Sequence, residues 1–90
     1  MLILPAELTL QQATACLRML VQGLKASKES EVVADASALQ RFDSSAIAVL
    51  LECRREALAL GKRLTVSSLP ARLTELAGLY GVAELLPATV

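Results

Sequence analysis

Three adjacent polar residues, Asp43, Ser44 and Ser45, are the best candidates for chemistry in this chain. Their side-chain oxygens can accept hydrogen bonds from the free backbone amides that open a helix, so helix capping is one use for them. A serine in the first turn of a helix also suits phosphorylation, because a phosphate there meets those amides and the positive end of the helix dipole. If this region bound another protein through its apolar surface, the same phosphate would disrupt that contact, because it would add negative charge beside Asp43. The residues alone leave both uses open, and capping is the simpler one.

The rest of the composition argues against catalysis. The chain has no histidine, which removes the commonest general base and every nucleophile that pairs with it. Its four glycines are scattered and form no phosphate-binding loop. Asp35 and Asp43 are the only acidic residues near the ends of predicted strands, and a site made of these two carboxylates stays open. We expect a protein without catalytic residues and without a cofactor.

The two cysteines, Cys16 and Cys53, are far apart in the sequence and lack the spacing of a metal site. Each falls within a predicted helix, where a cysteine acts as a small buried hydrophobic residue. We therefore predict two free, buried thiols and no metal.

The length and charge of the chain limit the kinds of molecule that it is expected to bind. Ninety residues are enough for one small core, so we expect a single domain spanning residues 1–90. Nine basic and nine acidic residues leave no net charge, and Phe42 and Tyr80 are the only aromatic residues. This composition predicts no binding to nucleic acid or anionic lipid. A hydrophobic content of 54% without net charge favours a chain that works in a complex. With no signal peptide and no long apolar run, we expect a cytoplasmic protein that does not insert into a membrane.

The hydrophobic pattern predicts three strands that alternate with three helices. A short apolar strand precedes Thr9 and Gln12, which form a capping box that opens the first helix. Residues 31–37 read as a buried central strand, and residues 64–68 as an alternating one. A third helix follows Pro70. Such alternation predicts an α/β fold, with helices covering a small sheet.

The second helix, which starts at the Asp43 cap and stops at Gly61, is apolar over an unusually wide arc. Two interpretations follow. Neighbouring elements cover both flanks of the helix, or Ile47 and Leu51 belong to an apolar patch left open for another protein. The residues that share the main apolar face are Ala46, Val49, Leu50, Cys53, Ala57 and Leu60.

Residues 31–70, EVVADASALQRFDSSAIAVLLECRREALALGKRLTVSSLP, resemble the heart of the STAS domain, the family of sulfate-transporter tails and anti-sigma-factor antagonists. The family's Asp-Ser/Thr-Ser/Ala-Gly turn appears here as residues 43–46, with Ala46 in place of the usual glycine. The resemblance implies an α/β STAS-like fold, in which a small mixed sheet of three to four strands is covered by three or more helices. STAS domains usually begin with a β-hairpin, whereas residues 2–13 resemble only its second strand and the helix after it. The first strand is therefore expected to be short or missing, which would leave a bare sheet edge for a partner or a homodimer.

The closing run LPARLTELAGLYGVAELLP, residues 69–87, is similar to the ends of MlaB-type proteins. These are cytoplasmic STAS subunits of the Mla system, which moves phospholipid between the two membranes of Gram-negative bacteria. The resemblance covers nearly all of residues 2–87. It implies a non-enzymatic subunit that binds the ATPase of an ABC transporter, lies at the inner membrane only through that partner, and helps maintain outer-membrane lipid asymmetry. The implied partner-binding residues are Asp43, Ser44, Ser45, Ala46, Ile47 and Leu51.

A second interpretation comes from the same family. A stand-alone anti-sigma-factor antagonist would bind a kinase-like anti-sigma factor and would be switched by phosphorylation of Ser44 or Ser45, between which the sequence does not choose. A third, binding of a small apolar ligand, rests only on the high hydrophobicity.

Overall fold

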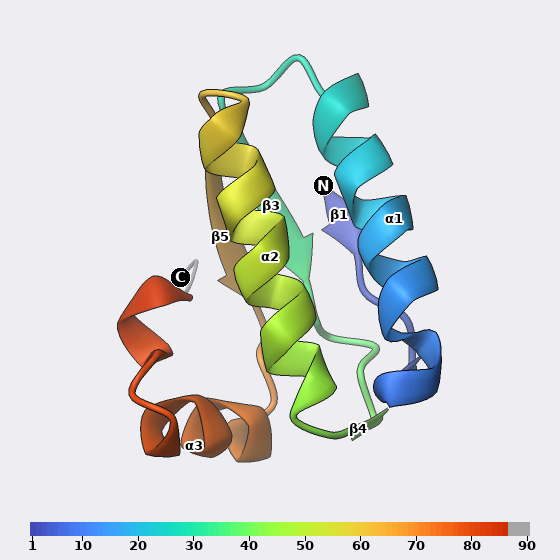
Figure 1. Cartoon of the computed structure of the whole chain (residues 1–90), viewed down its shortest axis with the longest axis vertical. Coiled ribbons are helices and arrows are strands. Elements are labelled where there is room, and N and C mark those ends of the chain that lie inside the picture. Colours follow the sequence, from blue (N-terminus) through green and yellow to red (C-terminus); the bar gives the residue numbers. More distant parts are fainter. Residues whose placement is uncertain (87–90) are drawn as a thin grey trace.

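The computed structural model describes residues 1–86, so the last four positions of the predicted domain lie outside the described residues. Figure 1 shows the helices and strands along the chain. The strands are β1 (Leu2–Ile3), β2 (Glu7–Leu8), β3 (Glu31–Asp35), β4 (Arg41–Phe42) and β5 (Arg63–Ser67). The helices are α1 (Leu10–Ala26), α2 (Ser45–Ala59), α3 (Ala71–Leu79) and the short 3-10 helix η1 (Ala83–Leu85).

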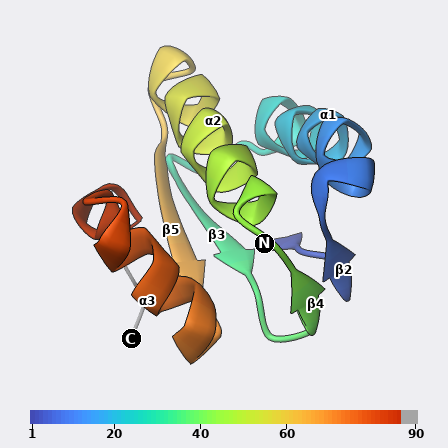
Figure 2. The ribbon, with the colours of Figure 1, turned by 60° about the horizontal axis from the view of Figure 1, so that its bottom comes forward.

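The main sheet has three strands in the order β1-β3-β5, and both pairings are parallel. The register places Val32 beside Leu64, and Leu2 beside Ala34. Strands β2 and β4 form a separate parallel pair, seen side by side in Figure 2. The α/β class is confirmed, but every pairing within residues 1–86 is parallel where a mixed sheet was expected. The reason is that α1 lies between β1 and β3 in the chain, and α2 lies between β3 and β5, so each helix returns the chain to the same end of the sheet. The chain opens with β1, a strand of only two residues that pairs with β3 and not with β2, so no N-terminal β-hairpin forms within residues 1–86.

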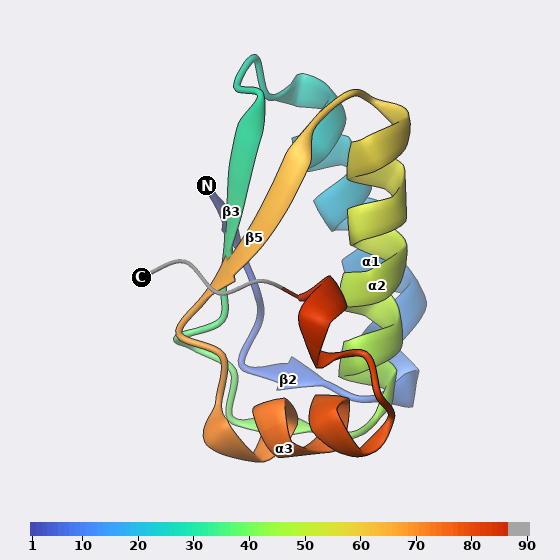
Figure 3. The ribbon, with the colours of Figure 1, turned by 90° about the vertical axis from the view of Figure 1, so that its left-hand side faces the viewer.

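Helices α1 and α2 cover one face of the main sheet, and α3 lies across the end at which the strands finish (Figures 1 and 3). On that covered face, Val32 and Val66 are buried, whereas Val33 and Thr65 on the other face are only half-buried. Strand β3 is central, as predicted. Its buried residues alternate with half-buried ones, so the expectation of a buried rather than alternating strand was wrong, because the helices that pack on the sheet lie on one side of it.

Local sequence signals set the helix ends. At the start of α1, the Gln12 side-chain oxygen accepts a hydrogen bond from the Thr9 backbone N–H at 2.9 Å, which confirms the capping box. At the end of α2, Gly61 has φ +71°, and the following N–H, of Lys62, bonds the carbonyl of Ala57 at 2.8 Å. This is the left-handed glycine end that the sequence predicted.

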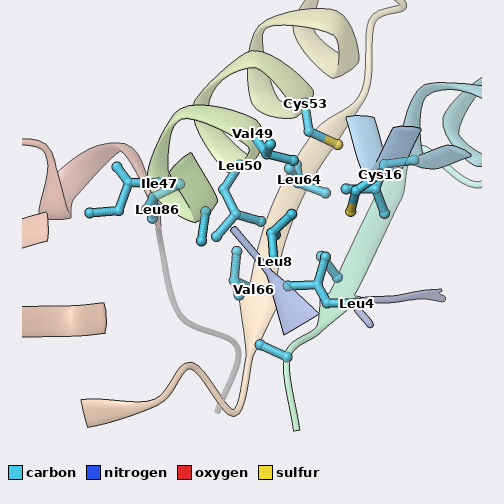
Figure 4. Packing of buried hydrophobic residues seen from close by; sticks show 14 of the residues in the cluster. Leu4, Leu8, Cys16, Ile47, Val49, Leu50, Cys53, Leu64, Val66 and Leu86 are labelled. Atoms are coloured by element: carbon cyan, nitrogen blue, oxygen red, sulfur yellow. The ribbon is translucent and has the colours of Figure 1, made fainter. Parts of the chain in front are cut away.

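The core is built mainly from leucine, valine and alanine (Figure 4). Cys16 and Cys53 are both free and buried within it, as predicted. Burial, with smaller contributions from Cys16 and Glu56, raises the pKa of the Cys53 thiol to about 11. None of the helices in residues 1–86 has the length and apolarity needed to cross a membrane.

Candidate functional site

Asp43 joins the openings of the two main helices. One of its carboxylate oxygens accepts a hydrogen bond from the backbone N–H of Ser45 at 2.8 Å, in the first turn of α2. The other accepts one from the backbone N–H of Leu10 at 3.2 Å, in the first turn of α1. These bonds, that of the Ser45 N–H first, lower the pKa of Asp43 below its ordinary value. Capping by Asp43 is thus confirmed, and its second partner on α1 was not predicted.

The two serines after Asp43 differ in what their hydroxyl groups do. Ser44 precedes the first residue of α2, is exposed, and its side chain makes no capping hydrogen bond. Ser45 is half-buried, and its hydroxyl, with a smaller effect than its backbone N–H, contributes to lowering the pKa of Asp43. Of the three polar residues in the turn, Asp43 carries the cap, Ser45 supports it, and Ser44 presents its hydroxyl to solvent.

The next two residues of the expected binding set lie inside the protein. Ala46 is fully buried, and Ile47 is only 3% exposed. Figure 4 shows Ile47 beside Leu86, which follows η1. The interpretation that Ile47 belongs to an open apolar patch was therefore wrong. The segment after α3 folds back along this flank of α2, and no structure was predicted for that segment from its residues. Leu51 is half-buried and packs against the core.

A strip of two exposed residues and one half-buried residue remains along the outward side of α2. Ser44, Ala48 and Leu51 follow one another at spacings of four and three residues, so they share one side of the helix. Beside this strip, a shallow groove of about 340 Å³ runs between α1 and α2. Leu10 lines its α1 side and is 76% exposed. We name as the cap surface the six residues Leu10, Asp43, Ser44, Ser45, Ala48 and Leu51.

Leu10 and Ala48 are the members of the cap surface that the sequence did not indicate. The spacing of Leu10 from Ala13 and Leu17 predicts that it lies on the buried side of α1, but Leu10 is the first residue of that helix and is 76% exposed. Leu10 could have been assigned to this surface only if it had been known that α1 and α2 begin side by side. In Figure 2 the two helices lie next to each other.

The chemistry available at the cap surface is that of binding. It offers one carboxylate, two hydroxyl groups and exposed apolar side chains, and its carboxylate is already bonded to two backbone amides. Asp35, the other carboxylate considered for a two-carboxylate site, accepts a hydrogen bond from the Ser37 N–H at 2.9 Å within its own turn. In the part of the chain that the structure describes, no group of three or more histidine, cysteine, aspartate or glutamate residues could hold a metal ion.

Comparison with known proteins finds a matching family and similar solved structures. The family model described as "Mlab, STAS domain" matches residues 1–87. Among solved structures, a Thermotoga maritima protein described as a candidate anti-sigma factor antagonist superposes with a TM-score of 0.74 at 16% sequence identity. The match covers 96% of this chain and 75% of the Thermotoga chain, and at that identity it establishes the fold alone. No curated protein matches the sequence.

Proposed function

Because this chain belongs to the STAS domain family, in the group described as MlaB, we propose that it is a non-enzymatic regulatory subunit of an Mla-type ABC transporter. It binds the transporter's ATPase subunit and stabilises the assembled ATPase dimer. Through that contact it supports the phospholipid transport that maintains lipid asymmetry in the outer membrane of a Gram-negative bacterium. It stays in the cytoplasm, meets the inner membrane only through its partner, and does not itself contact lipid.

The proposed contact is the cap surface. One observation carries this choice: a strip made of the exposed Ser44 and Ala48 and the half-buried Leu51 runs from a helix start that Asp43 holds in place. Because Asp43 bonds α1 and α2 together at this end, the strip and Leu10 form one preorganised surface, and little freedom is lost when a partner binds. Ala46 and Ile47, which the family resemblance included, contribute by packing beneath this surface.

Co-purification with the ATPase subunit tests the proposal. Ser44→Glu and Ala48→Asp each place a negative charge on the cap surface, and both should release the ATPase, because a charge buried in an apolar contact lacks a partner. Gln22→Glu adds the same charge to an exposed position near the other end of α1 and should leave binding unchanged. If Ser44→Glu and Ala48→Asp fold normally and still bind like the wild type, the cap surface is not the contact.

A second candidate is an anti-sigma-factor antagonist that is switched by phosphorylation. The observation that favours it is the exposed Ser44 hydroxyl at the start of α2, which forms no capping bond. A phosphate on Ser44 would add two negative charges beside Asp43 and the apolar strip, and would break a contact there. Incubation with a kinase-like anti-sigma factor and ATP, followed by intact-mass measurement, should show one added phosphate that Ser44→Ala abolishes. An unchanged mass, together with binding of an ATPase, eliminates this candidate.

A further inference from the structure

One face of the main sheet carries no helix of the described residues. Figure 3 shows α1 and α2 on the other side of β3 and β5, and α3 at the strand ends. Both pairings of this sheet are parallel, and parallel sheets are normally covered on both faces. We name the uncovered side the open face, and its residues on β3 and β5 are Glu31, Val33, Asp35, Arg63, Thr65 and Ser67.

Strand alternation and register arrange the open face in three rows. The residues between those of the open face point toward α1 and α2 and are almost fully buried: Val32, Ala34, Leu64 and Val66. The pairing of β3 with β5 defines the rows, which are Glu31 with Arg63, Val33 with Thr65, and Asp35 with Ser67. The first row therefore holds opposite charges, and the middle row holds two small, half-buried side chains.

This pattern makes the open face complementary to itself. Consider a second copy that packs face to face, related by a two-fold axis that runs parallel to the strands between β3 and β5. Strand β3 of each copy then lies over β5 of the other, and each row meets the same row with its two members exchanged. Glu31 thereby opposes the partner's Arg63, and the symmetry forms this contact twice. The small middle row lets the two sheets approach to about 10 Å, the usual separation of stacked sheets.

The other two-fold arrangements of this face oppose like charges. An axis along β3 places Glu31 over the partner's Glu31, and an axis along β5 places Arg63 over the partner's Arg63. An axis across the strands places Glu31 over the partner's Asp35. Like charges that face each other in a contact are strongly unfavourable, so the charge pattern selects the first arrangement.

Both charged groups are available for this contact. Glu31 and Arg63 are exposed. The one ion pair within residues 1–86 joins Arg55 to Glu52, so neither group is held in an ion pair with another described side chain. Ile3, which lies next to Asp35 in the register and is 64% exposed, adds apolar area beside the rows.

We propose that the open face binds a second copy of this chain, in a two-fold dimer in which β3 and β5 of one copy stack on β5 and β3 of the other. The contact lies on the opposite side of the sheet from the helices that carry the cap surface (Figure 3). Both surfaces can therefore be occupied at once. The proposal goes beyond the proposed function and does not depend on it.

Analytical ultracentrifugation of the purified chain tests the proposal. The wild type should form dimers in a concentration-dependent manner. Arg63→Glu and Glu31→Arg each bring like charges together in the dimer, so each should raise its dissociation constant about tenfold or more. Arg18→Glu makes the same change of charge as Arg63→Glu at an exposed position of α1, and it should leave the dissociation constant unchanged.

A mixture of the two charge-reversed variants gives the sharpest result. In a mixed dimer, the acidic side chains 31 and 63 of one variant face the basic side chains 63 and 31 of the other. Arg63→Glu and Glu31→Arg should therefore dimerise with each other at about the wild-type strength, although neither does so alone. Within each chain residues 31 and 63 keep like charges, so this rescue cannot come from relief of repulsion inside one copy.

Other outcomes overturn the proposal. It is wrong if the wild type remains monomeric up to about 1 mM, or if the mixture of folded variants does not dimerise. Self-association that Ser44→Glu abolishes and Arg63→Glu preserves would assign the dimer to the cap surface instead. If circular dichroism shows that a charge-reversed variant does not fold, Arg63→Gln replaces it, because this change removes one charge without creating a like-charged row. Arg63→Gln should weaken the dimer, and an unchanged dissociation constant would exclude the open face.

Discussion

Shortening Ile47 tests most directly which side of α2 is covered. The side chain is 3% exposed and lies beside Leu86. Ile47→Val removes one buried methylene, which should lower the free energy of unfolding by about 0.5–1.5 kcal/mol, and Ile47→Ala should lower it by about 2–5 kcal/mol. In a domain of this size, each 1 kcal/mol corresponds to a fall in Tm of roughly 4–8 °C. The two variants should therefore form a graded series.

Urea unfolding followed by circular dichroism measures this series, with Leu10→Ala as its control. Leu10 is 76% exposed, so its truncation should change the free energy of unfolding by no more than about 0.5 kcal/mol. The reasoning is refuted if Ile47→Ala unfolds at the wild-type urea concentration, or if Leu10→Ala is equally destabilising. Ile47→Val should also keep full binding to the ATPase. A loss of binding by that folded variant would restore Ile47 as a contact residue.

Three further predictions concern single groups. Hydrogen bonds lower the pKa of Asp43 in the folded protein, so the ionised carboxylate stabilises the fold near neutral pH. This stabilisation is lost as the pH falls below the ordinary pKa of 3.8 and through the lower pKa of the folded protein. The difference in urea midpoint between wild type and Asp43→Ala should therefore shrink in acid, and a constant difference would contradict the capping role. The pKa of Cys53 is raised from 9.0 to about 11, so stability should fall as the pH rises above 9.0, where the unfolded thiol ionises first. For the same reason iodoacetamide at about pH 8 should label Cys53 in urea but not in native protein, as mass spectrometry would show, and rapid native labelling would exclude its burial. The Lys62 ammonium group donates hydrogen bonds to the backbone carbonyls of Ser27 at 2.7 Å and Glu29 at 2.8 Å. Lys62→Met should therefore lower the free energy of unfolding in urea by about 1 kcal/mol. Lys28→Met, at an exposed position, should not change it measurably.

The features that the sequence predicted well depend on neighbouring residues. Thr9 and Gln12 are three positions apart and form their capping box without help from the rest of the fold. Gly61 ends α2 because its lack of a side chain permits a positive φ. The three helices and strands β3 and β5 follow in the same way from short-range apolar patterns. The STAS family and the α/β class were likewise predicted and are confirmed by the family match and the structural likeness.

The features that could not be predicted from the sequence depend on contacts between residues that are far apart in the chain. Strands β2 and β4 have two residues each and form only through pairing between Glu7 and Arg41 and between the residues that follow them. No periodic pattern can arise in two residues. The burial of Ile47 similarly depends on Leu86, far along the chain. The wide apolar arc of α2 predicts only that the sides of this helix are packed against something. Which side stays free for binding depends on where the other elements of the fold pack.

The position of Asp43 also changes how the turn at residues 43–46 should be interpreted. From the sequence, helix capping and a phosphorylation switch competed for the same three polar residues. In the structure Asp43 caps α2 and also bonds α1, Ser45 supports Asp43, and Ser44 forms no capping bond. Capping therefore does not occupy the hydroxyl that a kinase would need, and the two uses are compatible. It follows that Ser44→Ala should leave stability unchanged, and that any effect of this variant on partner binding would report on the contact itself.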